Sequence, residues 1–397
     1  MIKKISIYLV TLLLLITGTI AVVMYGKGYN FSLGDGKIGI SGTGLLAATS
    51  SPDGAGIYIN DHLTSATNNT VNLAPGEYDI KIVKSGYFPW KKKIKIEKEV
   101  VSTAYALLLP TAPKLDNITD AGISNPVMDP SRTKIAYTAS SSDSPRKNGV
   151  YVLDMSLRPI LTLQSSSTQI AEDTIDAFSK AKLSWSPDAK ELVATISAGP
   201  DTETTYLLKT NFNENPQDIT ATLANTQITW ALQKEKQDMS QLLGFKAKLK
   251  NLIKENFQIL SWSEDETKIL YTATQAVTLP LIISPRIIGA NSTQEERQIN
   301  KGNIYVYDLR EDKNFKILDS MPEELSLTWF PDSKHLIFVN DRKISIMDYD
   351  GLNKTTVYAG PFVDNYVFPW PDGSKILMLT DLGNPAISPN LYTIGLK

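Results

Sequence analysis

One short stretch recurs five times along this chain of 397 residues and constrains its fold more than any other feature. Its clearest copy is Trp185-Ser186-Pro187-Asp188, and a second is Trp329-Phe330-Pro331-Asp332. The other three, aligned on the proline position, begin at Pro130, Glu264 and Pro371. Self-similarity of this kind indicates a repeat architecture, in which neighbouring repeats bury a continuous core.

Each repeat predicts four short strands. The motif is followed by a continuous apolar run, such as Leu336-Ile337-Phe338-Val339, then by another strand and a short outer strand. A strand that is apolar on both faces must be covered on both faces, as in packed blades. Residues 114–397 therefore predict a β-propeller of about five blades, with outer strands expected at 160–163, 218–220, 315–318 and 355–358.

The fifth blade lacks an outer strand of its own because the sequence stops at Lys397. A segment of the right type, residues 115–119, precedes the first repeat. We expect this segment to complete the C-terminal blade, which closes the ring and removes its open edges. This arrangement favours five blades over six.

These repeats resemble the WD40-like β-propeller repeat of the TolB periplasmic protein, whose core reads Trp-Ser-Pro-Asp-Gly. Residues 185–188 and 329–332 match well and Pro371-Asp372-Gly373 matches best, whereas Met128 and Ser131 depart from the pattern. TolB-like rings commonly have six blades, so five is a further departure. The resemblance implies a protein-binding scaffold that recognises partners through loops at one mouth, and it carries over no catalytic residues.

Side chains within the repeats have simple structural interpretations. Tryptophans at a fixed place beside each turn are expected to pack between blades. The motif aspartates are expected to form turns, since Asp bonds its own backbone two residues on. Asp348-Tyr349-Asp350-Gly351 lacks the other ligands of an EF-hand calcium loop. We therefore predict no catalytic, cofactor-binding or metal-binding residues.

Two insertions interrupt the repeat spacing. Residues 221–257 place apolar side chains at helical intervals, with lysines on the polar side and a break expected at Gly244. This helix is expected to dock on its own propeller, with a partner helix or a membrane surface as alternatives. Residues 275–301 pass from apolar to polar and predict a long mobile loop.

The N-terminus predicts a membrane anchor. Ile5 to Met24 form an apolar run without charge, about 30 Å long as a helix, which matches the hydrocarbon core of a bilayer. Lys3 and Lys4 precede it and predict a cytoplasmic N-terminus, with everything after Lys27 outside. A cleaved signal peptide is the alternative, although Thr19-Ile20-Ala21 makes a poor cleavage site. We assign 1–25 as a transmembrane signal anchor and 26–44 as a glycine-rich tether or short strands.

Residues 45–110 predict a small β-sandwich. Apolar and polar residues alternate in 56–60, 77–83 and 93–97, as in half-buried strands, and Pro75-Gly76 and Ser85-Gly86 supply turns. Pro52-Asp53-Gly54-Ala55, Pro75-Gly76-Glu77-Tyr78 and Gly86-Tyr87 resemble the PEGA domain of bacterial and archaeal surface proteins. Asp53 replaces the glutamate of the family's name. The resemblance implies extracytoplasmic placement and no known catalysis.

A lysine cluster marks the sandwich, and it consists of Lys91, Lys92, Lys93, Lys95 and Lys98. It is interpreted as the solvated face of an edge strand, where lysines discourage aggregation, with binding of anionic wall polymer or lipid headgroups as the alternative. Asp61-His62 is interpreted as a polar turn.

Charge and composition exclude several classes of function. The net charge of −2 argues against nucleic acid as a partner. The charge is uneven, because residues 1–113 carry 11 basic and 7 acidic residues, whereas the rest of the chain carries 29 basic and 35 acidic residues. The chain has no cysteine and two histidines, which excludes thiol chemistry and leaves little material for imidazole catalysis.

The leading hypothesis is a single-pass, membrane-anchored extracytoplasmic scaffold that is not an enzyme and binds an envelope protein or cell-wall polymer. A glycan hydrolase using carboxylates in the propeller channel and a structural surface-layer component are the alternatives.

Overall fold

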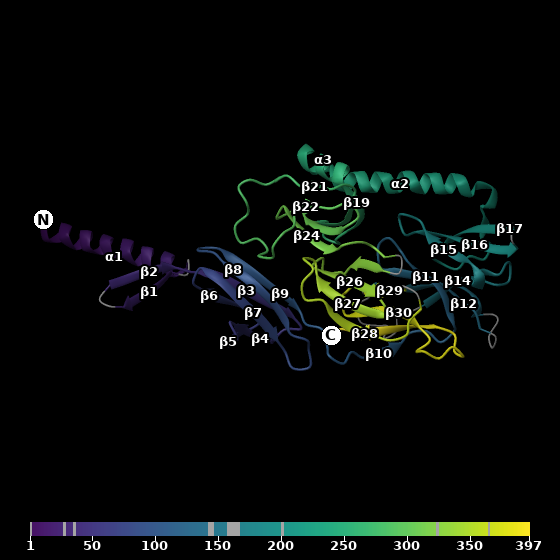
Figure 1. The fold of residues 1–397 in the computed structure, drawn as a ribbon, viewed down its shortest axis with the longest axis horizontal. Coiled ribbons are helices and arrows are strands. Elements are labelled where there is room, and N and C mark those ends of the chain that lie inside the picture. The colour runs from purple at the N-terminus through teal and green to yellow at the C-terminus, as the bar shows by residue number, and fades with distance from the viewer. Residues whose placement is uncertain are drawn as a thin grey trace. The chain divides into compact units, whose positions relative to one another are not determined.

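The computed structural model describes residues 2–397 except 27–28, 35–36, 142–146, 157–166, 200–201, 323–324 and 364–365. The chain divides into two compact units (Figure 1). Unit 1 comprises Met1–Thr111, Leu281–Glu296 and Glu311–Lys313, and unit 2 comprises Ala112–Pro280, Arg297–Arg310 and Asn314–Lys397.

Unit 1 begins with helix α1 (Ile2–Gly26), which covers the predicted apolar run. Its side chains from Tyr8 to Val23 include many exposed apolar residues. Within the part of the chain that the structure describes, no helix has the combined length and hydropathy needed to span a bilayer, so the expected transmembrane helix is not supported. The glycine-rich tether contains the antiparallel hairpin of β1 (Tyr29–Gly34) and β2 (Lys37–Gly42).

The predicted sandwich is present as two sheets. One sheet has the order β6-β3-β9 and the other β5-β4-β7-β8. Apolar residues alternate along these strands, so one face of each sheet contributes to a shared core that includes Ile57, Ile80, Ile82 and Ile94. The strands are β3 (Gly44–Ser51), β4 (Gly56–Ile59), β5 (His62–Ala66), β6 (Asn69–Leu73), β7 (Gly76–Val83), β8 (Trp90–Ile96) and β9 (Val101–Leu107).

The insertion predicted as a mobile loop differs from that expectation. Residues 281–296 belong to unit 1, although the surrounding chain belongs to a propeller blade. The hydroxyl of Ser292 accepts a hydrogen bond of 3.0 Å from the backbone N–H of Lys95, on the edge strand β8. A Cβ on Gly289 would lie 2.5 Å from a methyl carbon of Val100, so the approach there requires glycine. The base of the insertion is the pair β21 (Val277–Thr278) and β22 (Gln298–Ile299) in unit 2.

Unit 2 contains, among its described residues, five four-stranded sheets, here called blades 1 to 5. Blade 1 is β11-β12-β13-β14, blade 2 is β15-β16-β17-β18, blade 3 is β19-β20-β23-β24, blade 4 is β25-β26-β27-β28 and blade 5 is β29-β30-β31-β10. The strands of blades 1 and 2 are β11 (Ile123–Met128), β12 (Lys134–Ala139), β13 (Gly149–Asp154), β14 (Ser167–Glu172), β15 (Lys182–Trp185), β16 (Glu191–Gly199), β17 (Thr202–Lys209) and β18 (Gln217–Asp218).

Blades 3 to 5 follow the same meander. Their strands are β19 (Phe257–Trp262), β20 (Lys268–Ala273), β23 (Ile304–Asp308), β24 (Lys313–Leu318), β25 (Ser326–Trp329), β26 (His335–Asn340), β27 (Lys343–Asp348), β28 (Thr355–Ala359), β29 (Val367–Pro369), β30 (Lys375–Thr380), β31 (Asn390–Gly395) and β10 (Leu115–Asn117). The outer strand expected at 160–163 lies outside the described residues, and the outer strand of blade 1 is β14 instead.

The ring closes as the repeat pattern predicts. β10 pairs antiparallel with β31, with Leu115 opposite Ile394 and Asn117 opposite Tyr392. Thr119 continues the contact, since its hydroxyl accepts a 2.9 Å hydrogen bond from the buried backbone N–H of Leu391. One core cluster contains residues of blades 1 and 5 together, so the first and last blades are neighbours.

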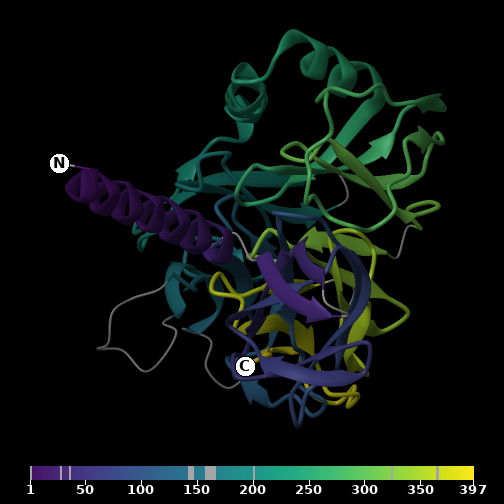
Figure 2. The same cartoon turned by 90° about the vertical axis from the view of Figure 1, so that its left-hand side faces the viewer.

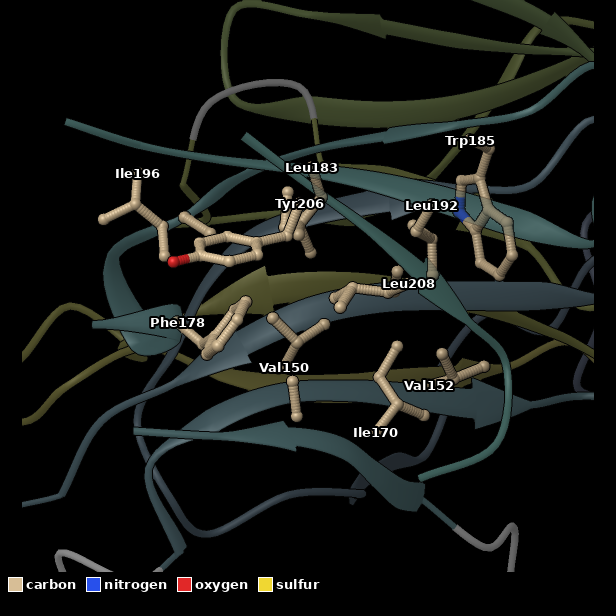
Figure 3. Close-up of a cluster of buried hydrophobic side chains, with 14 residues drawn as sticks. Val150, Val152, Ile170, Phe178, Leu183, Trp185, Leu192, Ile196, Tyr206 and Leu208 are labelled. Atoms are coloured by element: carbon tan, nitrogen blue, oxygen red, sulfur yellow. The ribbon is translucent and has the colours of Figure 1, made fainter. Parts of the chain in front are cut away.

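Blades pack face to face through apolar side chains. Figure 3 shows the cluster between blades 1 and 2, where Val150, Val152 and Ile170 of blade 1 face Leu192, Tyr206 and Leu208 of blade 2. Trp185 sits at the edge of this cluster, and its indole N–H donates to the carbonyl of Val127 on blade 1 at 3.0 Å. Trp329 of blade 4 makes the equivalent bond to Ser261 of blade 3 at 3.4 Å. The expectation that tryptophans join blades is confirmed at these two positions.

The insertion between blades 2 and 3 forms two helices, α2 (Leu223–Leu243) and α3 (Ala247–Asn256), separated at Gly244 as expected. Short 3₁₀ helices occur at Phe178–Lys180 and Thr220–Thr222. α3 buries Leu249, Leu252 and Ile253, so this helix docks on its own propeller. α2 lies at the periphery of the propeller in both views (Figures 1 and 2).

Candidate interaction surface

The five motif turns share one backbone geometry. Each joins the first and second strands of its blade and contains one residue with positive φ at the same place, two residues before the second strand. These residues are Arg132, Ala189, Glu266, Ser333 and Gly373, with φ between 54° and 64°. Four turns therefore adopt the left-handed conformation without glycine, which side-chain hydrogen bonds to the local backbone help to maintain.

Those hydrogen bonds come from the motif aspartates, as the sequence predicts. Asp265 accepts from the backbone N–H and the hydroxyl of Thr267, and Asp332 accepts from the N–H of Lys334. In blade 1 the buried Asp129 has this role and accepts from the N–H groups of Thr133 and Lys134. These carboxylates accept several hydrogen bonds, and bonding to Thr267 and Ser263 outweighs burial and holds the pKa of Asp265 below its usual value.

Every motif turn joins the first and second strands of its blade, and in a propeller the corresponding loops of all blades lie at one end of the ring. We call this end the motif mouth, formed by residues 129–133, 186–190, 263–267, 330–334 and 370–374. Neighbouring turns touch, since the N–H of Asp265 in blade 3 donates to the hydroxyl of Ser333 in blade 4 at 3.0 Å. The loop 381–389 joins the second and third strands of blade 5 and so lies at the opposite end.

Charges of both signs meet at the motif mouth. Burial lowers the pKa of Arg132, and Glu264 opposes this shift, so a charge on blade 3 acts on a cation of blade 1. Burial also lowers the pKa of Lys334, and this lysine interacts with the carboxylates of Asp332 and Asp265 and with Lys268. Residues of three blades therefore create one electrostatic surface at this mouth.

His335, the first residue of β26, is buried between two carboxylates beneath the mouth. Its Nδ1 lies 2.6 Å from Asp332 and its Nε2 lies 3.2 Å from Asp348. Burial alone would lower the pKa of His335, but the two carboxylates outweigh it and raise the pKa to about 9. The imidazolium then donates a hydrogen bond to each carboxylate and ties the motif turn to the end of β27.

The same register recurs in other blades. A basic residue that starts the second strand lies opposite an aspartate that ends the third, as Lys134 with Asp154, Lys268 with Asp308 and His335 with Asp348. This pairing was missed from the sequence, although in these three blades the alignment places the basic residue four positions after the motif proline position. Asp348 accepts hydrogen bonds from His335 and Asn353, and Asp350 accepts one from the N–H of Leu352, so both carboxylates of the Asp348–Gly351 stretch have partners within the protein.

In unit 1 the lysine cluster lies on β8, an edge strand, as interpreted from the sequence, except for Lys98, which follows the strand. Lys93 faces Asp79 across the sheet at 4.0 Å, and Lys95 lies 3.1 Å from Glu97. Lys91 is directly opposite Lys81, and like charges in this position repel one another. Part of this face is therefore neutralised locally by Asp79 and Glu97.

Among the described residues, no group of three or more acidic or histidine side chains is placed to hold a metal ion. The sequence predicted no catalytic, cofactor or metal residue. The structure offers two candidate interaction surfaces, the motif mouth of unit 2 and the lysine face of β8 in unit 1. Arg132 and Glu264 were not singled out from sequence, because the electrostatic interaction between them links blades that are not consecutive.

Comparison with protein families identifies residues 43–109 as a PEGA domain, which confirms the predicted domain. No curated protein matches the chain in sequence.

Solved structures that match include a putative TolB from Agrobacterium tumefaciens, with 13% identity, a TM-score of 0.23, and coverage of 68% of this chain and 78% of that one. TolB from Acinetobacter baumannii matches with 15% identity, a TM-score of 0.23, and coverage of 81% and 60%. An acylaminoacyl peptidase from Pyrococcus horikoshii has 13% identity, a TM-score of 0.19, and coverage of 67% and 36%. Scores this low carry no argument, and the propeller assignment rests on the sheet topology.

Proposed function

We propose that this protein is an extracytoplasmic, envelope-associated binding protein whose propeller recognises a protein partner at the motif mouth. The observation that carries the proposal is the PEGA domain at residues 43–109, a domain of surface proteins, followed along the chain by a closed ring of five blades. In this account the propeller binds its partner and does not transform it.

The charge pattern supports a protein as the partner. Arg132, Glu264, Asp265 and Lys334 place both signs within one mouth, which suits a protein surface with complementary charges of both signs. An anionic wall polymer would be better matched by a surface of one sign. The lysine face of β8 is the alternative site for such a polymer.

Attachment to the membrane through α1 is the second part of the proposal. Lys3 and Lys4 lie in the first turn of the helix, before its apolar run, and Leu12, Leu13, Leu14 and Leu15 are each more than half exposed. Apolar side chains exposed in this number favour burial in a lipid or protein environment. With the lysines on the cytoplasmic side, the PEGA domain and the propeller lie outside the cell.

Photocrosslinking in the native cells tests the proposal. A photoreactive phenylalanine analogue replaces Lys190, an exposed residue of the motif mouth, in the full chain. The matched control places the same analogue at Leu382, which is 51% exposed at the opposite end of the ring. We expect a discrete protein adduct from position 190 and none from position 382.

Three results would contradict the assignment. Adducts with wall polymer alone would show that the propeller binds glycan, and the alternative of a glycan hydrolase would then need hydrolysis assays. A protein adduct only from position 382 would place binding at the other mouth, and no adduct from either position would remove the support for a binding role.

A further inference from the structure

Helix α2 carries an apolar stripe that no part of the described chain covers. Ile228, Leu232, Met239 and Leu243 are 59%, 61%, 56% and 72% exposed. At about 100° per residue these four side chains fall within an arc of about 60°. All of α2 is described, and it contains no buried residue. The stripe is therefore a continuous exposed surface, about 22 Å long at 1.5 Å per residue.

The stripe points away from the propeller. The opposite face of α2 makes the contacts, since Gln241 donates to Glu266 of blade 3 at 3.1 Å and Gln237 donates to the carbonyl of Pro187 of blade 2 at 3.5 Å. Trp230 and Gln233, which are half-buried, lie on this same inner face. The helix is thus held by polar contacts on one side and presents its apolar residues on the other, the reverse of an ordinary surface helix.

The stripe is also symmetric along the helix. Its residues are spaced by four, seven and four positions, so they read the same in either direction. The centre of this pattern lies between Glu235 and Lys236, both exposed and of opposite charge. If a second α2 runs antiparallel about this centre, Ile228 faces Leu243, Leu232 faces Met239, and each Glu235 faces a Lys236.

We propose that α2 is the interface of an antiparallel homodimer of this chain. A two-fold axis requires one patch to be complementary to itself, and the stripe meets this requirement in both its apolar spacing and its central charges. Two such helices bury eight apolar side chains and form two ion pairs where they cross. An interface of this size suits a weak, reversible dimer.

The charges of α2 favour a second copy over a lipid surface. Its charged residues are Lys234, Glu235, Lys236 and Asp238, two of each sign, whereas helices that lie on membranes usually have a basic polar face. Glu235 lies about 20° from the edge of the stripe, where it would meet the apolar part of a bilayer. In the antiparallel pair the same carboxylate meets a lysine.

Charge reversal tests the register in the full chain, purified in detergent and studied by analytical ultracentrifugation. Glu235→Lys and Lys236→Glu each place like charges opposite one another and should weaken the dimer by roughly tenfold. The double variant Glu235→Lys/Lys236→Glu restores opposite charges and should recover the wild-type dissociation constant within about threefold. The matched controls Asp238→Lys and Lys234→Glu make the same charge changes away from the stripe and should leave dimerisation unchanged.

The lack of native cysteine allows a direct test of geometry. A mixture of Leu232→Cys and Met239→Cys chains should form disulfide-linked heterodimers under mild oxidation, well above the yield of either variant alone. In the antiparallel pair these two positions face each other, whereas two copies of position 232 are about 10 Å apart along the helix.

Several outcomes would overturn the proposal. The first is a chain that stays monomeric at about 100 μM. The second is a dimer whose dissociation constant no α2 variant changes, because association would then be driven by α1. Failure of the double variant to recover would exclude this register. A fluorophore on Leu232→Cys that reports apolar surroundings only with phosphatidylglycerol vesicles would make lipid the occupant.

Discussion

His335 shows how a single buried side chain stabilises a motif turn. The residue is 3% exposed and lies between Asp332 of the turn and Asp348 at the end of β27. Phe330 packs against the imidazole edge-to-face at 6.3 Å. A buried charge is costly unless it is paired and hydrogen-bonded, and here both ring nitrogens have a carboxylate partner.

This arrangement predicts a pH dependence of stability. The pKa of His335 is about 9 in the folded protein, above the value near 6.5 of an unfolded chain. Its stabilisation is therefore complete below about pH 6.5 and is lost as the pH rises through about 9, a change on the order of 3 kcal/mol. Urea unfolding of wild type and His335→Gln between pH 6 and 9.5 measures it, and the variant should lose less stability over this range.

His62→Gln is the matched control, because His62 is exposed at the start of β5. It should reproduce the wild-type profile. Equal pH dependence in wild type and His335→Gln would show that the buried pair does not carry the effect.

Among the elements, β10 is short and completes blade 5. Three residues from the start of unit 2 complete a sheet whose other strands lie at the C-terminus. Replacing 115–119 by Gly-Ser-Gly-Ser-Gly removes the apolar and Thr119 side chains and loosens this strand. We expect a loss of a few kcal/mol, seen as a decrease in Tm of roughly 5–10 °C by calorimetry.

The control keeps the strand and changes its exposed polar side chains. Asp116→Ser/Asn117→Ser retains the backbone ladder to β31 and removes only surface interactions, so its Tm should stay within about 2 °C of wild type. An equal decrease in both variants would mean that closure by β10 is not what stabilises the ring.

The sequence was informative about elements wherever a physical pattern repeats. The motif, the continuous apolar runs and the lone strand at 115–119 predicted the five sheets. Every blade needs the same strands, because each is apolar on both faces and packs between two neighbouring blades. The packing of residues 281–296 against unit 1 was not predictable. A polar loop has no hydrophobic periodicity that indicates which element it contacts. The same limit applies to α2, where helical spacing predicted amphipathicity but not that the apolar side faces outward.

At the scale of the whole molecule, the proposed function places the PEGA domain and the propeller outside the cytoplasm as a binding protein. The PEGA domain supports this location, and the two proposals assign different partners to the motif mouth and to α2. One surface has mixed charge and suits another protein, and the other is apolar and complementary to itself. The cysteine-free sequence means that any introduced thiol is the only one in the protein.

The most direct measurement is therefore labelling of a single introduced cysteine in intact native cells. His62→Cys places an exposed thiol in the PEGA domain, and a membrane-impermeant maleimide reports which side of the membrane it occupies. The account predicts labelling in intact cells equal to that after lysis. Labelling only after lysis would place the domain inside the cell and contradict the proposed function.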